Sequence, residues 1–88
     1  MSDKYEEILK SGLLNVSQKK YSESKKFFEK LIKINNKRYE GYLNLSNILV
    51  IENKLTEANK LLKDYLIKIN HNSEIINSLA INLYNSHN

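Results

Sequence analysis

The chain repeats its hydrophobic pattern every 34 residues, and this period limits the possible folds more than any other feature. Residues 21–24 and 55–58 begin two similar stretches, and blocks starting at Tyr5, Tyr39 and Ser73 agree in their apolar positions. The same register aligns three small residues, which are Gly12, Ser46 and Ala80. A period of roughly 20–50 residues indicates stacked supersecondary units that bury a continuous core between neighbours.

The spacing of apolar residues within each block predicts helices at 3–17, 21–35, 39–52, 55–69 and 73–85. The second and fourth of these are apolar on one face, as in helices that cover a core from one side. The third is apolar nearly all round, so we expect neighbours to cover it on more than one side. Small residues let a facing helix approach closely, so bulky substitutions are expected to cost about 1–3 kcal/mol at Gly12, Ser46 and Ala80.

These blocks resemble the tetratricopeptide repeat, whose pattern runs from an aromatic through Leu-Gly and Tyr to Ala-x-x-x-Phe and a final Pro. The matching residues are Tyr42, Leu45, Ser46, Ala58 and Leu62 in the middle block, Gly12, Tyr21, Ser24 and Phe28 in the first, and Ile76, Leu79, Ala80 and Leu83 in the last. The resemblance implies an all-α fold, a right-handed α-solenoid of antiparallel helix pairs with about five helices. It covers residues 1–88 as one domain, with repeat 1 at about 5–38, repeat 2 at about 39–72 and a half repeat at 73–88. An ordinary helical hairpin bundle is the alternative.

The sequence departs from the family pattern at the turns. It contains no proline, and Asn36 and Asn70 stand where the pattern has one. Lys19 and Asn53 replace the glycine between the two helices of a repeat. Asparagine tolerates the left-handed backbone that such turns often need, whereas lysine does so less well.

The length and composition of the chain fit one small domain with a single core. At 88 residues, folding buries only about 60–65% of the surface of the unfolded chain. The absence of cysteine excludes disulfides, and no run of 18 apolar residues provides a membrane span. Residues 1–4 lead directly into an amphipathic pattern with Glu6 and Glu7, which is not a secretory signal. We therefore expect a cytoplasmic protein.

A net charge of +4 raises the question of nucleic-acid binding. The lysines of 21–35 and 55–69 alternate with acidic residues, and mixed signs on an outward helix face usually mark a solvated surface. The densest basic cluster is formed by Lys19, Lys20, Lys25, Lys26, Lys37 and Arg38. Nucleic acid is not the expected partner, and the binding of a polyanion or nucleic acid through the basic outer helices stays the alternative.

No constellation of residues predicts catalysis or metal binding. The two histidines, His71 and His87, fall in an expected turn and near the C-terminus, without a cysteine or a suitably spaced carboxylate. A Gly-rich phosphate loop is absent, as is a nucleophile with a base at helical spacing. We expect no cofactor, no metal and no enzyme acting alone. An accessory repeat domain of a larger enzyme is a further alternative.

The family resemblance implies a ligand surface, because similar repeats line a concave groove with the first helix of each unit. Carried onto this chain, the groove positions are Glu6, Leu9, Leu13, Val16, Ser17, Glu40, Leu43, Asn47, Val50, Ile51, Glu74, Asn77, Ile81 and Tyr84, with Asn44 beside them. This largely apolar surface favours a partner protein that offers an apolar extended segment or an amphipathic helix, with Asn44 and Asn47 available to its backbone.

Two of the groove positions also argue against one class of ligand. Leu9 and Leu13 occupy places where chaperone-binding relatives carry the lysine and asparagine that hold a terminal carboxylate. An acidic C-terminal peptide is therefore disfavoured. An alternative role for Leu13 and Val50 is to close the groove against neighbouring helices.

The last predicted helix carries a second apolar stripe, formed by Ile75, Ile76, Leu79, Leu83 and Tyr84. The ends of repeat arrays normally need a polar cap. We expect the stripe to be covered by further repeats of a longer chain, by a second copy of this chain, or by a partner protein. Self-association through Ile75, Ile76, Leu79 and Leu83 is thus a second expected use of the chain.

Overall fold

The structure is a computed structural model that describes residues 3–69 and 71–86. This part of the chain forms five helices and no strand: α1 (Lys4–Ser17), α2 (Tyr21–Ile34), α3 (Glu40–Ile51), α4 (Leu55–Lys68) and α5 (Ser73–Ser86). The all-helical fold expected from the sequence is confirmed, and every helix end lies within one residue of its predicted position. Among the described residues, no helix has the length and apolar character that crossing a membrane requires.

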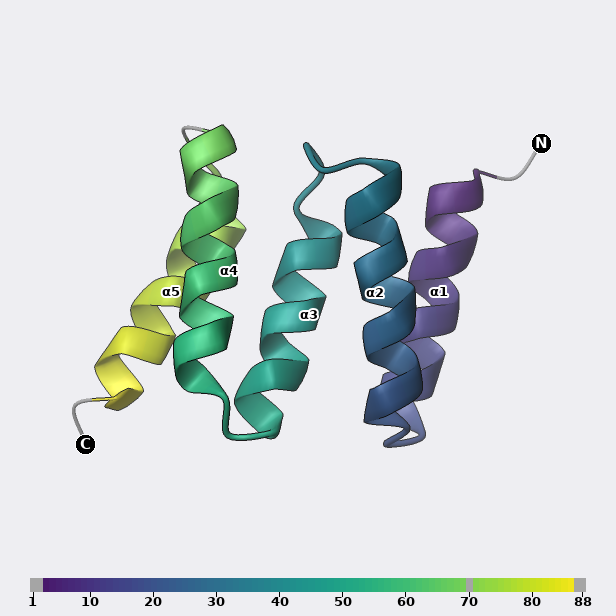
Figure 1. Ribbon diagram of the computed structural model, residues 1–88, viewed down its shortest axis with the longest axis horizontal. Coiled ribbons are helices and arrows are strands. Elements are labelled where there is room, and N and C mark those ends of the chain that lie inside the picture. Colours follow the sequence, from purple (N-terminus) through teal and green to yellow (C-terminus); the bar gives the residue numbers. More distant parts are fainter. Residues whose placement is uncertain (1–2, 70, 87–88) are drawn as a thin grey trace.

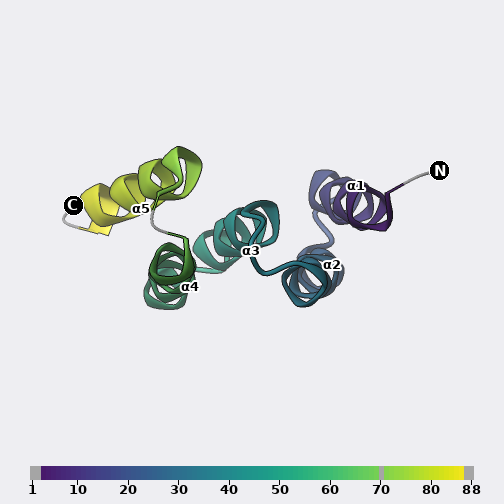
Figure 2. The ribbon, with the colours of Figure 1, turned by 90° about the horizontal axis from the view of Figure 1, so that it is seen from above.

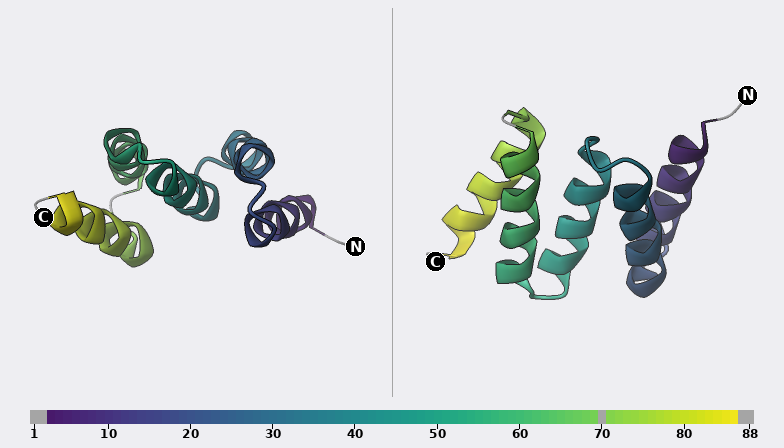
Figure 3. Two further views of the ribbon diagram at one scale, coloured as in Figure 1. Left: turned by 90° about the horizontal axis from the view of Figure 1, so that it is seen from below. Right: turned by 45° about the horizontal axis from the view of Figure 1, so that its top comes forward.

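Successive helices lie side by side and run in alternating directions (Figure 1). Seen from above, α1 and α5 lie on one side of the molecule and α2 and α4 on the other, with α3 between the two groups (Figure 2). Figure 3 shows the same zigzag from two further directions, and α5 is inclined against α4. The molecule is a thin slab, 44 Å long and 16 Å thick, so each helix contacts mainly its neighbours in the chain.

The backbone repeats with the period of the sequence, most visibly in the turns that follow α1 and α3. Lys19 and Asn53, 34 positions apart, both adopt a left-handed conformation, with φ of 59° and 64°. In each turn the next N–H donates to a carbonyl five residues back at 2.8 Å, from Lys20 to Asn15 and from Lys54 to Leu49. This capping pattern is the Schellman motif. Asn53 suits this backbone, and Lys19 adopts it although lysine tolerates it less well.

The apolar core consists of two clusters that meet at α3. The first contains Tyr5, Ile8, Phe28, Leu31, Leu45 and Ile48, and the second contains Tyr42, Leu62, Tyr65 and Ile75. α3 contributes Leu45 and Ile48 to the first cluster and Tyr42 to the second. Burial on two sides explains why this helix is apolar nearly all round, as predicted.

Close helix packing depends on small residues at two of the three predicted positions. A Cβ atom added at Gly12 would lie 2.5 Å from Cε1 of Phe28, and Ser46 is completely buried in α3. Ala80, in contrast, is exposed. The expectation that a bulky residue at Ala80 would overpack the core is wrong, because among the described residues no helix lies against that side of α5.

Candidate interaction surfaces

Within the described residues, α2, α3 and α4 each lie between two helices, so each has two sides with different neighbours. We call the side that contacts the following helix the forward side, and the side that contacts the preceding helix the backward side. In α3 the backward side contains Gly41, where an added Cβ would lie 3.0 Å from Cγ1 of Ile32 in α2. The forward side contains Tyr42, whose ring centroid is 4.8 Å from that of Tyr65 in α4. Residues adjacent in sequence thus contact opposite neighbours.

The same division corrects the prediction of a single self-association stripe in α5. Ile75, which is 34 positions after Gly41, is completely buried on the backward side against Leu62 and Tyr65. It is therefore not available for self-association. Leu79 is partly buried against the same cluster. Ile76 and Leu83 are each 40% exposed. Ile76 differs from its neighbour Ile75 because successive residues of a helix point about 100° apart.

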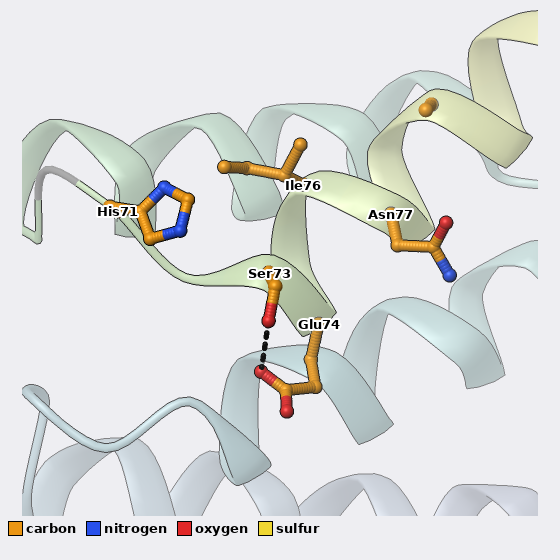
Figure 4. A pocket seen from close by; sticks show the side chains of 6 residues that line it. His71, Ser73, Glu74, Ile76 and Asn77 are labelled. Carbon is orange, nitrogen blue, oxygen red and sulfur yellow. Dashed lines mark hydrogen bonds between the residues drawn. The ribbon is translucent and has the colours of Figure 1, made fainter.

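A hollow of about 540 Å³ lies beside the exposed forward side of α5. It is lined by His71, Ser73, Glu74, Ile76, Asn77 and Ala80 (Figure 4). The Ser73 hydroxyl donates a hydrogen bond of 3.3 Å to Oε2 of Glu74 at its edge. Most of the lining area is apolar, with one carboxylate at the edge. Of the two histidines in the sequence, His71 lines this hollow, and His87 lies outside the described residues.

The predicted groove positions all lie on α1, α3 and α5, as the period requires. Exposed apolar side chains among them are Leu13, Val50, Ile51, Ile81 and Tyr84. Exposed polar ones are Ser17, Asn47, Glu74 and Asn77. The half-buried positions are Glu6, Leu9, Val16, Glu40, Leu43 and Asn44.

Some of these half-buried side chains already make contacts within the molecule. Leu9 and Val16 pack against the first core cluster, and Leu43 packs against the second. Nδ2 of Asn44 donates to the Glu40 carbonyl at 2.8 Å. The exposed Asn47 is therefore the better placed of the two predicted amides to meet a ligand backbone.

Two predicted groove carboxylates are joined by Arg38, a role that sequence reasoning missed. Nη2 of Arg38 lies 2.8 Å from Oε1 of Glu6 and 2.9 Å from Oε2 of Glu40. The guanidinium also stacks on Tyr5, with Cζ 3.9 Å from the ring centroid, and Tyr5 Oη donates to Oε1 of Glu40 at 3.3 Å. We call Tyr5, Glu6, Arg38 and Glu40 the Arg38 cluster. It links α1 to the start of α3.

Ionisation within the Arg38 cluster follows from burial and from the arginine. Burial raises the pKa of Tyr5 to about 12, and the neighbouring Glu40 charge acts in the same direction. Burial also acts to raise the pKa of Glu40, but hydrogen bonds from Arg38 and a backbone N–H outweigh it, so this pKa lies below its ordinary value of 4.5. Glu40 is thus held as a carboxylate, and Tyr5 as a neutral phenol.

Glu74 occupies in α5 the place that Glu6 and Glu40 occupy in α1 and α3, at intervals of 34 residues. The position equivalent to Arg38 is Asn72, whose Oδ1 accepts a hydrogen bond from the N–H of Ile75 at 3.0 Å. Among the described residues, no cation lies within ion-pair distance of Glu74. The last of the three equivalent carboxylates therefore faces solvent at the edge of the hollow.

Several lysines of the outer helices are paired with carboxylates. Nζ of Lys25 lies 2.8 Å from Oε1 of Glu52, and both side chains are about three-quarters buried. On the surface, Lys26 pairs with Glu23 and Lys60 with Asp64. Mixed ion pairs of this kind fit the solvated surface predicted from the charge pattern. Within the described residues, no group of three potential metal ligands occurs.

Two buried amide atoms, one in α4 and one in α5, have no hydrogen-bond partner among the described residues. They are Nδ2 of Asn82, a residue only 6% exposed, and Oδ1 of Asn59. Asn82 lies 34 positions after Ile48, which is a fully buried core residue of α3. The backward side of α5 is consequently less apolar than that of α3.

A comparison of this chain with protein-family models finds no match. A comparison with curated proteins finds no match either.

Proposed function

We propose that the chain is a non-catalytic interaction module, a right-handed α-solenoid of the tetratricopeptide type. Its repeated turns at Lys19 and Asn53 and its alternating helices support this architecture. In such an array α1, α3 and α5 line the concave face. That face is the proposed binding groove.

The main support for the groove is the location of exposed apolar side chains. Ten large apolar residues are exposed among the described residues, and five of them lie at predicted groove positions: Leu13, Val50, Ile51, Ile81 and Tyr84. Exposed apolar patches on a small protein often mark binding sites for other proteins. The proposed ligand is an apolar extended segment or an amphipathic helix of a partner protein.

The charged groups of the groove refine this proposal. Arg38 pairs with both Glu6 and Glu40, and these three side chains keep one net negative charge, so one end of the face offers no free cation to an acidic ligand. Glu74 keeps an unpaired carboxylate among the described residues, and the exposed Asn47 can bond a ligand backbone. A ligand with apolar residues and no net negative charge fits best.

The proposal is tested by selecting peptides from a displayed random library against the folded chain. Selected peptides should be apolar and should bind the double variant Ile51→Glu with Ile81→Glu at least about tenfold more weakly. Ile67→Glu is the matched control, because Ile67 is exposed on α4, outside the groove. Selected peptides that bind the double variant and the control equally well would remove the groove from consideration.

A further inference from the structure

The forward sides of α1 and α3 are built alike, and each is covered by the next helix. On α1, Ile8 and Gly12 meet α2, with Phe28 against the glycine. On α3, Tyr42 meets Tyr65 of α4, and Ser46 is completely buried. A forward side therefore combines one large apolar residue with one small residue, and an amphipathic helix lies over both.

The forward side of α5 has the same composition but is exposed. Ile76 stands where α1 has Ile8, Ala80 stands where it has Gly12, and Leu83 follows at helical spacing. All three are exposed, and the hollow of about 540 Å³ lies beside them. The equivalent sides of α1 and α3 thus define the occupant that would fit: an amphipathic helix with a large apolar residue opposite Ala80.

Charge at the first turn of α5 further defines the occupant. Arg38 follows α2, four positions after the last helical residue Ile34, and binds Glu6 in the first turn of the helix that α2 covers. Glu74 occupies the equivalent first-turn position in α5 and lines the hollow beside Ile76 (Figure 4). No cation pairs with it among the described residues. A lysine or arginine just after the occupant's helix would supply the missing charge.

A second folded copy of this chain cannot offer its α2 or α4 to this face. The two helices with the required pattern are α2 and α4, and their apolar faces are already used: Phe28, Leu31 and Leu62 are completely buried. Presenting either helix to another copy would require the donor to unfold. Neither α2 nor α4 of a second folded copy is therefore the occupant.

We propose that the forward face of α5, formed by Glu74, Ile76, Ala80 and Leu83, is a docking site for one amphipathic helix of a partner protein. The helix runs antiparallel to α5, as α2 runs against α1, so its C-terminal end lies near Glu74. It carries a basic residue within about four positions of that end. The site shares Glu74 with the proposed groove, but its apolar residues Ile76, Ala80 and Leu83 lie outside the groove positions, so it does not depend on groove binding.

The test uses a synthetic peptide that copies residues 54–72 with Asn72→Arg, the position equivalent to Arg38. A hydrocarbon staple replaces the copies of the exposed pair Lys60 and Asp64, because short helices are marginal in water. Amide NMR spectra of the folded chain are recorded during titration to about 1 mM peptide, a range that detects even weak complexes. Saturable shifts are expected at Ile76, Ala80 and Leu83.

Variants separate this site from other surfaces. Leu83→Glu is expected to weaken binding about tenfold or more, and Glu74→Gln about threefold, since the latter removes one partly exposed ion pair. The effect of Glu74→Gln should disappear with a peptide that retains Asn72. Ile51→Glu in the groove and Ile67→Glu on α4 are matched controls, and both should leave peptide affinity unchanged.

Three results would overturn the proposal. The first is the absence of shifts in α5 at the highest peptide concentration, with circular dichroism showing that the chain is folded. The second is a loss of binding in Ile51→Glu but not in Leu83→Glu, which would place the helix in the groove. The third is a stable dimer of the free chain in analytical ultracentrifugation that Leu83→Glu dissociates, which would make a second copy the occupant.

Discussion

α3 and α5 occupy equivalent places in the repeat, yet their surroundings differ. α3 is covered on both sides, and its backward and forward sides each contribute to a core cluster. Among the described residues, α5 is covered on its backward side only, where Asn82 replaces the apolar residue that α3 has at Ile48. The comparison shows that a periodic sequence does not distribute stability evenly, because the same position contributes according to the neighbours it meets.

The largest expected effect on the free energy of unfolding comes from substitutions on the backward sides of α3 and α5. Ile48→Asn removes a fully buried apolar side chain and places an amide where apolar residues surround it, so we expect it to lower the free energy of unfolding by about 3–5 kcal/mol. Urea denaturation monitored by circular dichroism measures the loss. If Ile48→Asn lowers the free energy of unfolding by less than about 1 kcal/mol, the backward sides of α3 and α5 are less different than the structure indicates.

The reciprocal change, Asn82→Ile, is the control for this comparison. It removes a buried Nδ2 that has no hydrogen-bond partner among the described residues and adds apolar contact against α4, so we expect a gain of about 1 kcal/mol. Equal destabilisation by both changes would contradict the proposed difference between the helices.

The next difference concerns the forward sides. Gly12→Val brings new atoms against Phe28, from which even a Cβ would be only 2.5 Å away, so we expect a loss of about 2–3 kcal/mol. Ala80→Val, at the equivalent exposed position of α5, should change the free energy of unfolding by about 0.5 kcal/mol or less. Thermal and urea unfolding of both variants measure the contrast. A similar loss at both positions would indicate a covered forward side in α5.

A smaller difference concerns the equivalent carboxylates and depends on pH. Because the folded-state pKa of Glu40 lies below its ordinary value of 4.5, its contribution to stability is present above that pH and is lost as the pH falls through the lower folded value. At pH 7 we expect Glu40→Gln to cost about 1 kcal/mol, allowing for solvent screening of the partly exposed pair. The cost should shrink as the solution becomes more acidic.

Glu74→Gln is the matched control, since no cation pairs with Glu74 among the described residues. It removes no ion pair from the described part of the chain, so at pH 7 it should lower the free energy of unfolding by less than Glu40→Gln does. Urea unfolding of both variants at a series of pH values provides the measurement. If Glu40→Gln costs the same at low pH as at pH 7, the ion pair with Arg38 does not stabilise the fold.

The features that sequence reasoning predicted are those set by local chemistry and by the period. Helix ends follow from the spacing of apolar residues, and the equivalent turns after α1 and α3 follow from the period of 34 residues. The double burial of α3 follows from its apolar residues on every side. These inferences require only neighbours in sequence or residues related by 34 positions.

The features that sequence reasoning missed depend on which neighbouring helix a side chain contacts. Ile75 and Ile76 are identical residues next to each other, and only the packing of α4 decides that the first is buried and the second exposed. Arg38 lies in a connection whose path brings it to Glu6 and Glu40. The burial of Asn82 carried a usable signal, because the period aligns it with Ile48.

Native-state hydrogen exchange, read residue by residue by NMR, tests the contrast between α3 and α5 most directly. We predict that the central amides of α3 exchange only through global unfolding, whereas those of α5 exchange through a local opening at least about 1–2 kcal/mol lower in free energy. Binding of a helix to the forward face of α5 should raise the opening free energy of the α5 amides towards that of the α3 amides. Amides of α5 that are as well protected as those of α3 in the free chain would contradict one-sided coverage of α5.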